Sequence, residues 1–325
     1  MISFQPFRNT DPPVVTAIWR AQAGQPGYVQ PVSVDLFEQL LFGKLHFDYD
    51  GLILARDGNR PVGMAHAGFG PNQSRDGLSH DVGITSLIAP VPDCPAPEEV
   101  AAGLLDRCEA YLAERGAKVF YGGGVRPMSP FYLGLYGGSE PPGVLETDHV
   151  ARQAFADHGY REVDRTVALK LPLETFEAPF DRRQLQIRRQ MVLEVQHDVP
   201  TRTWWDALML GDFDLTRLEI APRGSDHPVG RAVFRNIEPI GVGAIGRRIG
   251  LIDLFVDEAL RRRGVAVYLL SEAFRQFGRQ GVTMIETQTM QHNTPALPLL
   301  RKLGFGPVFQ GSVFRKKTEE EPTDK

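Results

Sequence analysis

The chain has few cysteines, no long apolar run and no large excess of charge of either sign. Its two cysteines, Cys94 and Cys108, form neither a disulfide framework nor a metal-ligand spacing, which favours a reducing compartment and no bound metal. A net charge of −4 gives no electrostatic reason to expect a nucleic-acid partner. No apolar segment approaches the length of a bilayer span, and residues 1–5 lack the profile of a signal peptide. We therefore expect a cytoplasmic protein that contacts neither nucleic acid nor membrane.

What the chain does contain is a repeat. Its 325 residues suffice for two domains with full cores. At one constant offset, Pro61-Val62-Gly63 and Gly83-Ile84 recur as Pro228-Val229-Gly230 and Gly250-Leu251. The first copy carries extra chain, most of it the Pro/Gly-rich loop 129–144. A period this long indicates duplicated domains rather than a solenoid.

Prolines and acidic residues interrupt the pattern of strands and helices between the two copies. We expect four segments: an N-terminal domain over residues 1–172, a linker over 173–181, a C-terminal domain over 182–317 and a charged, disordered tail over 318–325. The second copy lacks a clear pair of helices before its hairpin. We therefore expect the linker or the first copy to supply part of the wall of the second domain.

One stretch of the second copy combines a strand, a glycine turn and a helix start. Leu251–Val256 is an apolar run around Asp253 and predicts a buried strand, and helical spacing resumes after Gly264. Such a turn presents several free backbone N–H groups at the positive end of a helix, where a pyrophosphate binds. Gly264 removes the side chain that would block close approach, and Ala266 keeps the next position small.

With Asn293-x-x-Ala296 and the closing Leu303-Gly304-Phe305, this stretch resembles the GNAT acetyltransferase superfamily, whose pyrophosphate loop reads Gln/Arg-x-x-Gly-x-Gly/Ala. The resemblance implies an α/β (α+β) chain of two tandem GNAT-like domains, each a mixed, mostly antiparallel twisted sheet flanked by helices. It also implies N-acetyl transfer from acetyl-CoA, without a metal, to a small-molecule or peptide amine. The two copies would form an internal pseudo-dimer, and we expect a monomer.

The first copy departs from the family pattern where the cofactor would bind. Its loop position reads Pro95-Ala96-Pro97-Glu98-Glu99, with no glycine. Prolines remove N–H donors and the glutamates repel a diphosphate. The later Asn is replaced by Asp148. We therefore expect a degenerate N-terminal domain, structural or substrate-shaping, and an active C-terminal domain.

The resemblance implies three sets of acetyl-CoA contacts in the second copy. The pantetheine arm would pair with a strand backbone, the diphosphate would lie on the glycine loop, and the later motif would complete the site. The residues, in that order, are Leu254, Phe255 and Val256; Arg261, Arg262, Arg263, Gly264, Val265 and Ala266; and Asn293 and Ala296.

Amine acetylation needs a neutral amine, so a base is expected nearby. Asp253 and Glu286 are the candidates, although Asp253 equally fits a structural role. The resemblance assigns the donor that stabilises the oxyanion to the backbone N–H of Phe255 or Val256. Many family members carry a tyrosine that protonates the leaving thiolate, and this chain has Leu300 at that position.

Two other interpretations stay open at this point. Without the tyrosine, the chain also fits a non-catalytic acyl-CoA-binding sensor or interaction module. A literal Gly-x-Gly-x-x-Gly at residues 241–246 suggests dinucleotide binding, but a strand follows it where that motif requires a helix. Trp204, Trp205, Asp206 and the glycine-rich loop 132–144 are candidates to line an acceptor pocket.

Overall fold

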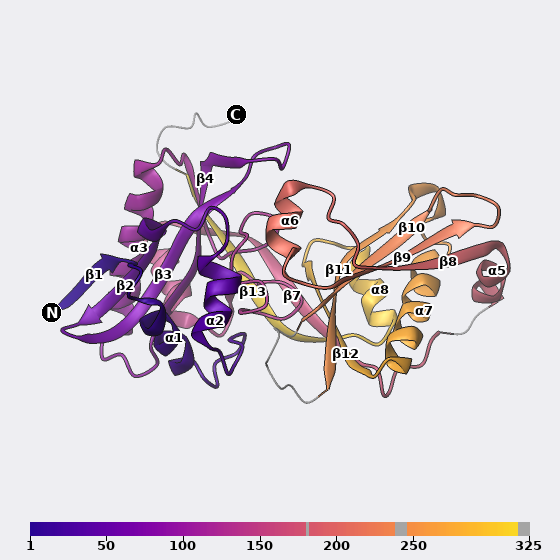
Figure 1. Cartoon of the computed structure of the whole chain (residues 1–325), viewed down its shortest axis with the longest axis horizontal. Coiled ribbons are helices and arrows are strands. Elements are labelled where there is room, and N and C mark those ends of the chain that lie inside the picture. Colours follow the sequence, from indigo (N-terminus) through magenta and orange to yellow (C-terminus); the bar gives the residue numbers. More distant parts are fainter. Residues whose placement is uncertain (180–181, 238–245, 318–325) are drawn as a thin grey trace.

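The computed structural model describes residues 1–179, 182–237 and 246–317, and the two halves of the chain lie side by side along its longest axis (Figure 1). The tail 318–325 and most of the 241–246 glycine motif lie outside the described residues. The first half, residues 1–172, contains β1 (Ile2–Pro6), α1 (Pro12–Ala21), α2 (Val34–Phe37), the π-helix η1 (Glu38–Phe42), the 3-10 helix η2 (Tyr49–Gly51), β2 (Leu52–Asp57), β3 (Arg60–Pro71), β4 (Leu78–Pro90), α3 (Pro97–Glu114), β5 (Val119–Gly122), β6 (Val144–Leu145), α4 (His149–Asp157) and β7 (Arg161–Pro172).

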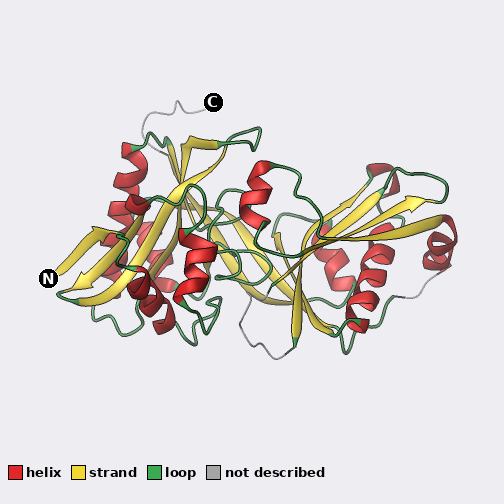
Figure 2. Cartoon of the chain, in the orientation of Figure 1, coloured by secondary structure: helices red, strands yellow, loops and turns green. Residues whose placement is uncertain are grey.

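The second half, residues 173–317, repeats the strand–helix–strand unit of the first (Figure 2). The parallel pairs β4–β5 and β11–β12 are each bridged by a helix, α3 or α7, and the other pairings among the described strands are antiparallel. Its elements are α5 (Arg182–Gln190), β8 (Met191–His197), α6 (Trp204–Leu210), β9 (Leu215–Pro222), β10 (Gly230–Asn236), β11 (Arg247–Val256), the 3-10 helix η3 (Glu258–Leu260), α7 (Val265–Arg279), β12 (Val282–Met290), α8 (Ala296–Lys302) and β13 (Gly306–Lys317).

All the strands of the described residues join one continuous sheet, and the halves exchange their last strands. The order is β1-β2-β3-β4-β5-β13-β7-β12-β11-β10-β9-β8, with β6 paired to β13. Strand β13 pairs with β5 of the first half, β7 pairs with β12 of the second, and β7 and β13 pair with each other. The expected mixed, mostly antiparallel sheet is confirmed, and neither half completes it alone.

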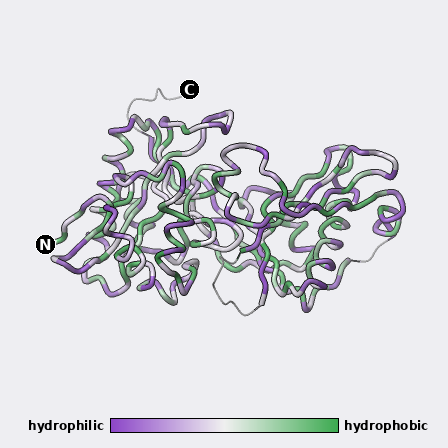
Figure 3. Tube along the Cα trace, in the orientation of Figure 1, coloured by the Kyte–Doolittle hydropathy of each residue, from purple (hydrophilic) through white to green (hydrophobic). Residues whose placement is uncertain are grey.

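Helical and strand periodicity explain the two main cores. In α7, Val265, Leu269 and Phe277 return to one face and are buried against the sheet. In contrast, α5 is hydrophilic along most of its length (Figure 3) and buries only Ile187. A third, small cluster joins Leu133 of the first half to α6 of the second. That cluster lies at the junction of the two halves.

Candidate functional site

The loop between β11 and α7 exposes its three arginines and turns at Gly264. Arg262 and Gly264 have φ values of 61° and 91°, a region that glycine adopts without strain. Gly264 caps α7, whose first backbone N–H groups have no acceptor within the helix. A Cβ at Gly264 would lie 3.2 Å from Gln184 Nε2 on α5. Bare main-chain donors therefore stand beside three cations, an arrangement that fits a diphosphate.

The side chains next to Gly264 do not cover the backbone N–H groups at the start of α7. Val265 directs its side chain into the core and is 3% exposed, whereas Ala266 is half-buried and small. The Arg261 side chain folds back, and its Nε donates to the Val256 carbonyl at 3.1 Å. This contact ties the loop to the end of β11.

Strands β11 and β12 separate before they end. Their pairing runs from Arg247 opposite Val282 to Leu251 opposite Thr287, although β11 continues to Val256 and β12 to Met290. On its other edge β11 stays paired with β10 to its last residue, and Ile252 bulges out of that register. We call Ile252–Val256 and Gln288–Met290 the strand fork. Leu254, Phe255 and Val256 thus have one sheet edge unpaired among the described strands.

The structure brings Asp253 and Glu286 to adjacent strands but gives them different surroundings. Asp253 lies within the strand fork, with a 42% exposed side chain that pairs with Arg231 Nε at 2.9 Å. Glu286 lies before the fork and is 4% exposed, with Lys170 Nζ at 3.1 Å and Arg248 Nη1 at 3.3 Å. A Cβ on Gly138 would collide with its carboxylate, so first-half backbone covers it.

The motif after β12 lies at the start of α8. Asn293 is exposed, and its Nδ2 donates to Thr289 Oγ1 at 3.0 Å, while its carbonyl accepts from the Ala296 N–H at 3.1 Å. Ala296 is the first residue of α8. Leu300 is 3% exposed in the core, so this position supplies packing and no proton donor.

In the first half the equivalent fork is closed by the chain itself. After Thr85 pairs with Gly122, the N–H groups of Gly123 and Gly124 continue to bond β4. A Cβ on Gly124 would contact Ser86 and Ser129, whose hydroxyls bond each other at 2.9 Å. Helix α3 also begins at a proline, with two glutamates in its first turn. This half therefore has neither an open fork nor an anion-binding helix start.

Sequence patterns pointed to loop 132–144 only as possible pocket lining, and the structure shows where this segment goes. Residues 123–143, which we call the docking loop, cross from the first half onto β10, β11 and β12. Arg235 Nε and Nη2 donate to the carbonyls of Ser139 and Gly138 at 2.9 and 2.8 Å. The docking loop thereby carries Glu140 onto the second half, where the charge of Asp253 acts on it, a coupling that no motif indicated.

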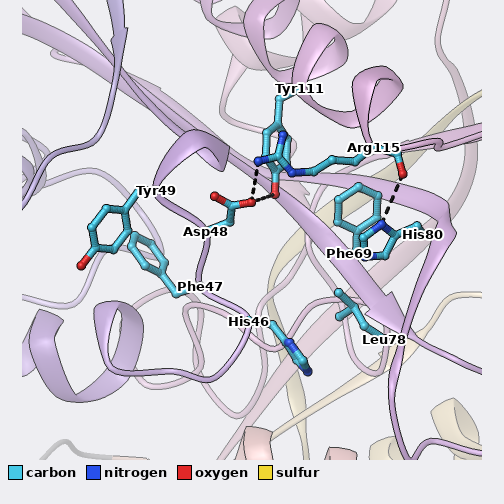
Figure 4. A pocket seen from close by; sticks show the side chains of 9 residues that line it. All are labelled: His46, Phe47, Asp48, Tyr49, Phe69, Leu78, His80, Tyr111 and Arg115. Atoms are coloured by element: carbon cyan, nitrogen blue, oxygen red, sulfur yellow. Dashed lines mark hydrogen bonds and ion pairs between the residues drawn. The ribbon is translucent and has the colours of Figure 1, made fainter.

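A cavity of about 410 Å³ opens elsewhere on the first half (Figure 4). Its Asp48 carboxylate accepts from the Tyr111 hydroxyl at 3.1 Å and pairs with Arg115 Nη2 at 2.9 Å, while Phe69 stacks on His80. These groups bind one another, and none of the lining residues belongs to the strand fork. Among the described residues, no group of three or more His, Cys, Asp or Glu side chains is arranged for a metal, and no helix is long and apolar enough to cross a membrane.

Comparison with known proteins agrees with this geometry. Residues 183–305 match the Acetyltransferase (GNAT) family. YwnH of Bacillus subtilis (strain 168), a phosphinothricin acetyltransferase by name, is 39% identical over 54 residues, which are 17% of this chain and 33% of that protein. The chain thus matches about a third of the length of this curated relative.

Solved structures extend the likeness to the whole chain at the level of fold. A GCN5-related N-acetyltransferase from Sphaerobacter thermophilus has a TM-score of 0.66 and 15% identity, with 97% of this chain and 95% of that chain covered. A tandem GNAT protein from the clavulanic acid biosynthesis pathway has a TM-score of 0.66 and 12% identity, with 100% of both chains covered.

Proposed function

Because this chain belongs to the GNAT superfamily in its tandem form, we propose that it is an N-acetyltransferase that moves the acetyl group of acetyl-CoA to an amine. Residues 182–317 are the active domain in this proposal, and residues 1–172 are a degenerate domain joined to it by the linker 173–181. The two halves act as an internal pseudo-dimer within a monomer.

The observation that carries the proposal is the difference between the two halves. The second half combines an open strand fork with a glycine-capped helix start and three exposed arginines. The first half fills its fork with Gly123 and Gly124 and begins α3 with Pro97. One acetyl-CoA per chain is therefore expected, in the second half.

In the proposed site, the diphosphate lies on the backbone from Arg262 to Ala266 and is neutralised by the arginine side chains. The edge of Leu254–Val256 accepts the pantetheine arm as an added strand, and the N–H of Phe255 or Val256 stabilises the oxyanion. Asn293 and Ala296 hold the turn that begins α8. Of the two carboxylates that the sequence offered as bases, the exposed Asp253 is the one that an amine in the fork can contact, whereas Glu286 is buried.

A non-catalytic acyl-CoA sensor is the alternative, favoured by Leu300 in the core where a thiolate donor would stand. A thiolate leaves without assistance near neutral pH because thiol pKa values are only about 8.5. Release of free thiol during incubation with acetyl-CoA and a panel of amines separates the two functions. Tight binding without release for every amine would favour the sensor.

The loop assignment is tested by calorimetry with acetyl-CoA. Gly264→Glu places a carboxylate where the diphosphate binds and strains a positive φ, so affinity should fall at least about 100-fold. The matched control is Pro97→Glu at the corresponding position of the first half, which should leave affinity within about twofold. Unchanged affinity in the Gly264 variant would remove the assignment.

A further inference from the structure

The docking loop belongs to the first half of the chain, but it places a segment with polar groups beside the strand fork of the second half. Ser139 packs on Gly250, because a Cβ there would lie 2.9 Å from the Ser139 Cβ. Two residues later, the Pro141 carbonyl accepts from Gln288 Nε2 at 2.9 Å. Glu140 stands between these two contacts, at the point where β11 and β12 part.

The carboxylate of Glu140 is held rather than free. Its side chain is 17% exposed and accepts from Arg126 Nη1 at 2.6 Å. The charged groups that act on it come from three elements: Arg126 of the docking loop, Arg235 of β10 and Asp253 of β11. Burial raises the pKa of the Glu140 carboxyl, and the two arginines oppose that rise.

Two polar atoms on the same segments have no hydrogen-bond partner among the described residues. Gln288 Oε1 is a buried acceptor, and Arg126 Nε is a buried donor. Buried polar atoms without partners are costly and are usually satisfied by a ligand, an ion or a water. Both side chains contact the segment around Glu140, where a polar ligand with N–H donors and an oxygen acceptor would satisfy both atoms.

Building on the acetyltransferase function above, we propose that Glu140 completes the acceptor site from the first half. It binds the ammonium group of a cationic amine together with Asp253 and Gln288 Oε1, and it accepts the proton that the amine must lose. Arg126 binds an oxygen of the same substrate. The substrate class is a polar amine with a nearby oxygen, such as an amino acid, an amino alcohol or an amino sugar.

The proton balance follows from this placement. The ammonium gives one proton to Glu140, and the neutral nitrogen then forms a C–N bond to the thioester carbonyl carbon. The C–S bond breaks, the thiolate takes the remaining excess proton from nitrogen, and Glu140 releases its proton to solvent. The products are the amide, CoA thiol and one proton.

The test compares Glu140→Gln with Glu146→Gln. Glu146 lies just beyond the docking loop, 41% exposed, and pairs with Arg165 at 3.5 Å, so its variant loses the same charge outside the fork. The amine probes are phosphinothricin, L-lysine, ethanolamine and glucosamine, with phenethylamine as an amine that has no oxygen. Thiol release gives kcat/KM against pH, and calorimetry on the CoA complex gives amine affinity without turnover.

We expect Glu140→Gln to lower kcat/KM at least about 100-fold, weaken binding of the oxygen-bearing amines about 10-fold and remove the acidic limb of the pH profile. Acetyl-CoA affinity and melting temperature should not change, and Glu140→Asp should recover part of the rate. Glu146→Gln should stay within about twofold of wild type.

The outcomes separate this inference from the function beneath it. Wild-type protein that binds no acetyl-CoA would overturn the acetyltransferase proposal itself. If wild type binds acetyl-CoA but neither binds nor turns over any oxygen-bearing amine, the substrate class is wrong. If wild type turns over an amine and Glu140→Gln keeps its rate and pH profile, Glu140 has no part in catalysis.

Discussion

Burial decides the chemistry of several single side chains in this protein, and His66 is the sharpest case. It lies on β3 among aromatic rings, 4.5 Å from Phe131 and 5.6 Å from Tyr132 between centroids. Neither ring nitrogen has a hydrogen-bond partner among the described residues. Desolvation by burial lowers the pKa of His66 to about 3, against a small opposing effect of Asp48. His66 is therefore a neutral core residue at physiological pH.

This burial predicts a pH-dependent stability. Below the ordinary histidine pKa of about 6.5, His66 is protonated in the unfolded chain, but in the folded protein it stays neutral down to about pH 3. The free energy of unfolding therefore decreases as the pH is lowered from about 6.5 to about 3. Between about pH 7 and about pH 5.5, wild type should lose about 1 kcal/mol more than His66→Phe. Urea unfolding of both proteins at the two pH values measures this, and equal losses would contradict it.

At the scale of single elements, the docking loop has a different role in each half. It closes the fork of the first half and covers part of the sheet beside the strand fork of the second half. In the first half its start continues the sheet and fills the fork with backbone. In the second half its middle segment lies over Gly250 and Glu286 and leaves Ile252–Val256 open. Arg235 holds this arrangement: it is 1% exposed, it bonds three carbonyls, and its guanidinium lies 4.5 Å from the Phe213 ring centroid.

Loss of Arg235 should therefore release the docking loop. Arg235→Met leaves the carbonyls of Gly138, Ser139 and Asn236 without their donor and should destabilise the protein by about 3 kcal/mol. Arg217→Met on β9 is the control, since Arg217 is 21% exposed and pairs with Glu219, and it should cost less than about 1 kcal/mol. Denaturant unfolding gives both values. Equal effects would show that Arg235 does not hold the loop.

Across the whole molecule, the exchanged strands couple the two halves. Phe314 of β13, near the end of the described chain, lies in the core of the first half at 5% exposure. Its ring stacks on Phe155 of α4 with 5.4 Å between centroids. The same strand pairs with β7, which in turn pairs with β12 of the second half. A change in β13 therefore acts on both halves through one sheet.

Phe314→Ala should destabilise the chain by about 3 to 4 kcal/mol, because a large buried ring is lost from a packed core. Hydrogen exchange should become faster in β2–β5 and also in β12, since the halves share their sheet. Val308→Ala, on the same strand but 48% exposed, should leave exchange nearly unchanged. Faster exchange confined to the first half would show that the halves unfold independently.

The sequence patterns predicted those structural features that depend on residues close together in the chain. The glycine turn, the strand before it and the helix after it follow from Leu251–Phe277, and Gly264 does adopt a positive φ. The two copies and the missing glycine before α3 were equally readable, because each is a matter of residue type and spacing. Catalytic roles for Asp253 and Glu286 stay predictions, but only the fold separates an exposed carboxylate from one covered by Gly138.

The sequence indicated only that loop 132–144 was a candidate to line a pocket and that the second copy takes part of its wall from elsewhere; it singled out neither Glu140 nor the exchanged strands. Glu140 stands in a Pro/Gly-rich loop of the half that lacks cofactor features, and the charge of Asp253 acts on it only because that loop crosses onto the other half. Likewise, β7 and β13 read as ordinary closing strands, and nothing local states which neighbour each will pair with. Backbone propensity and helix dipoles act over a few residues, so sequence determines them. Pairing partners, burial and the meeting of distant charges depend on how the whole chain packs, so the tertiary structure alone decides them.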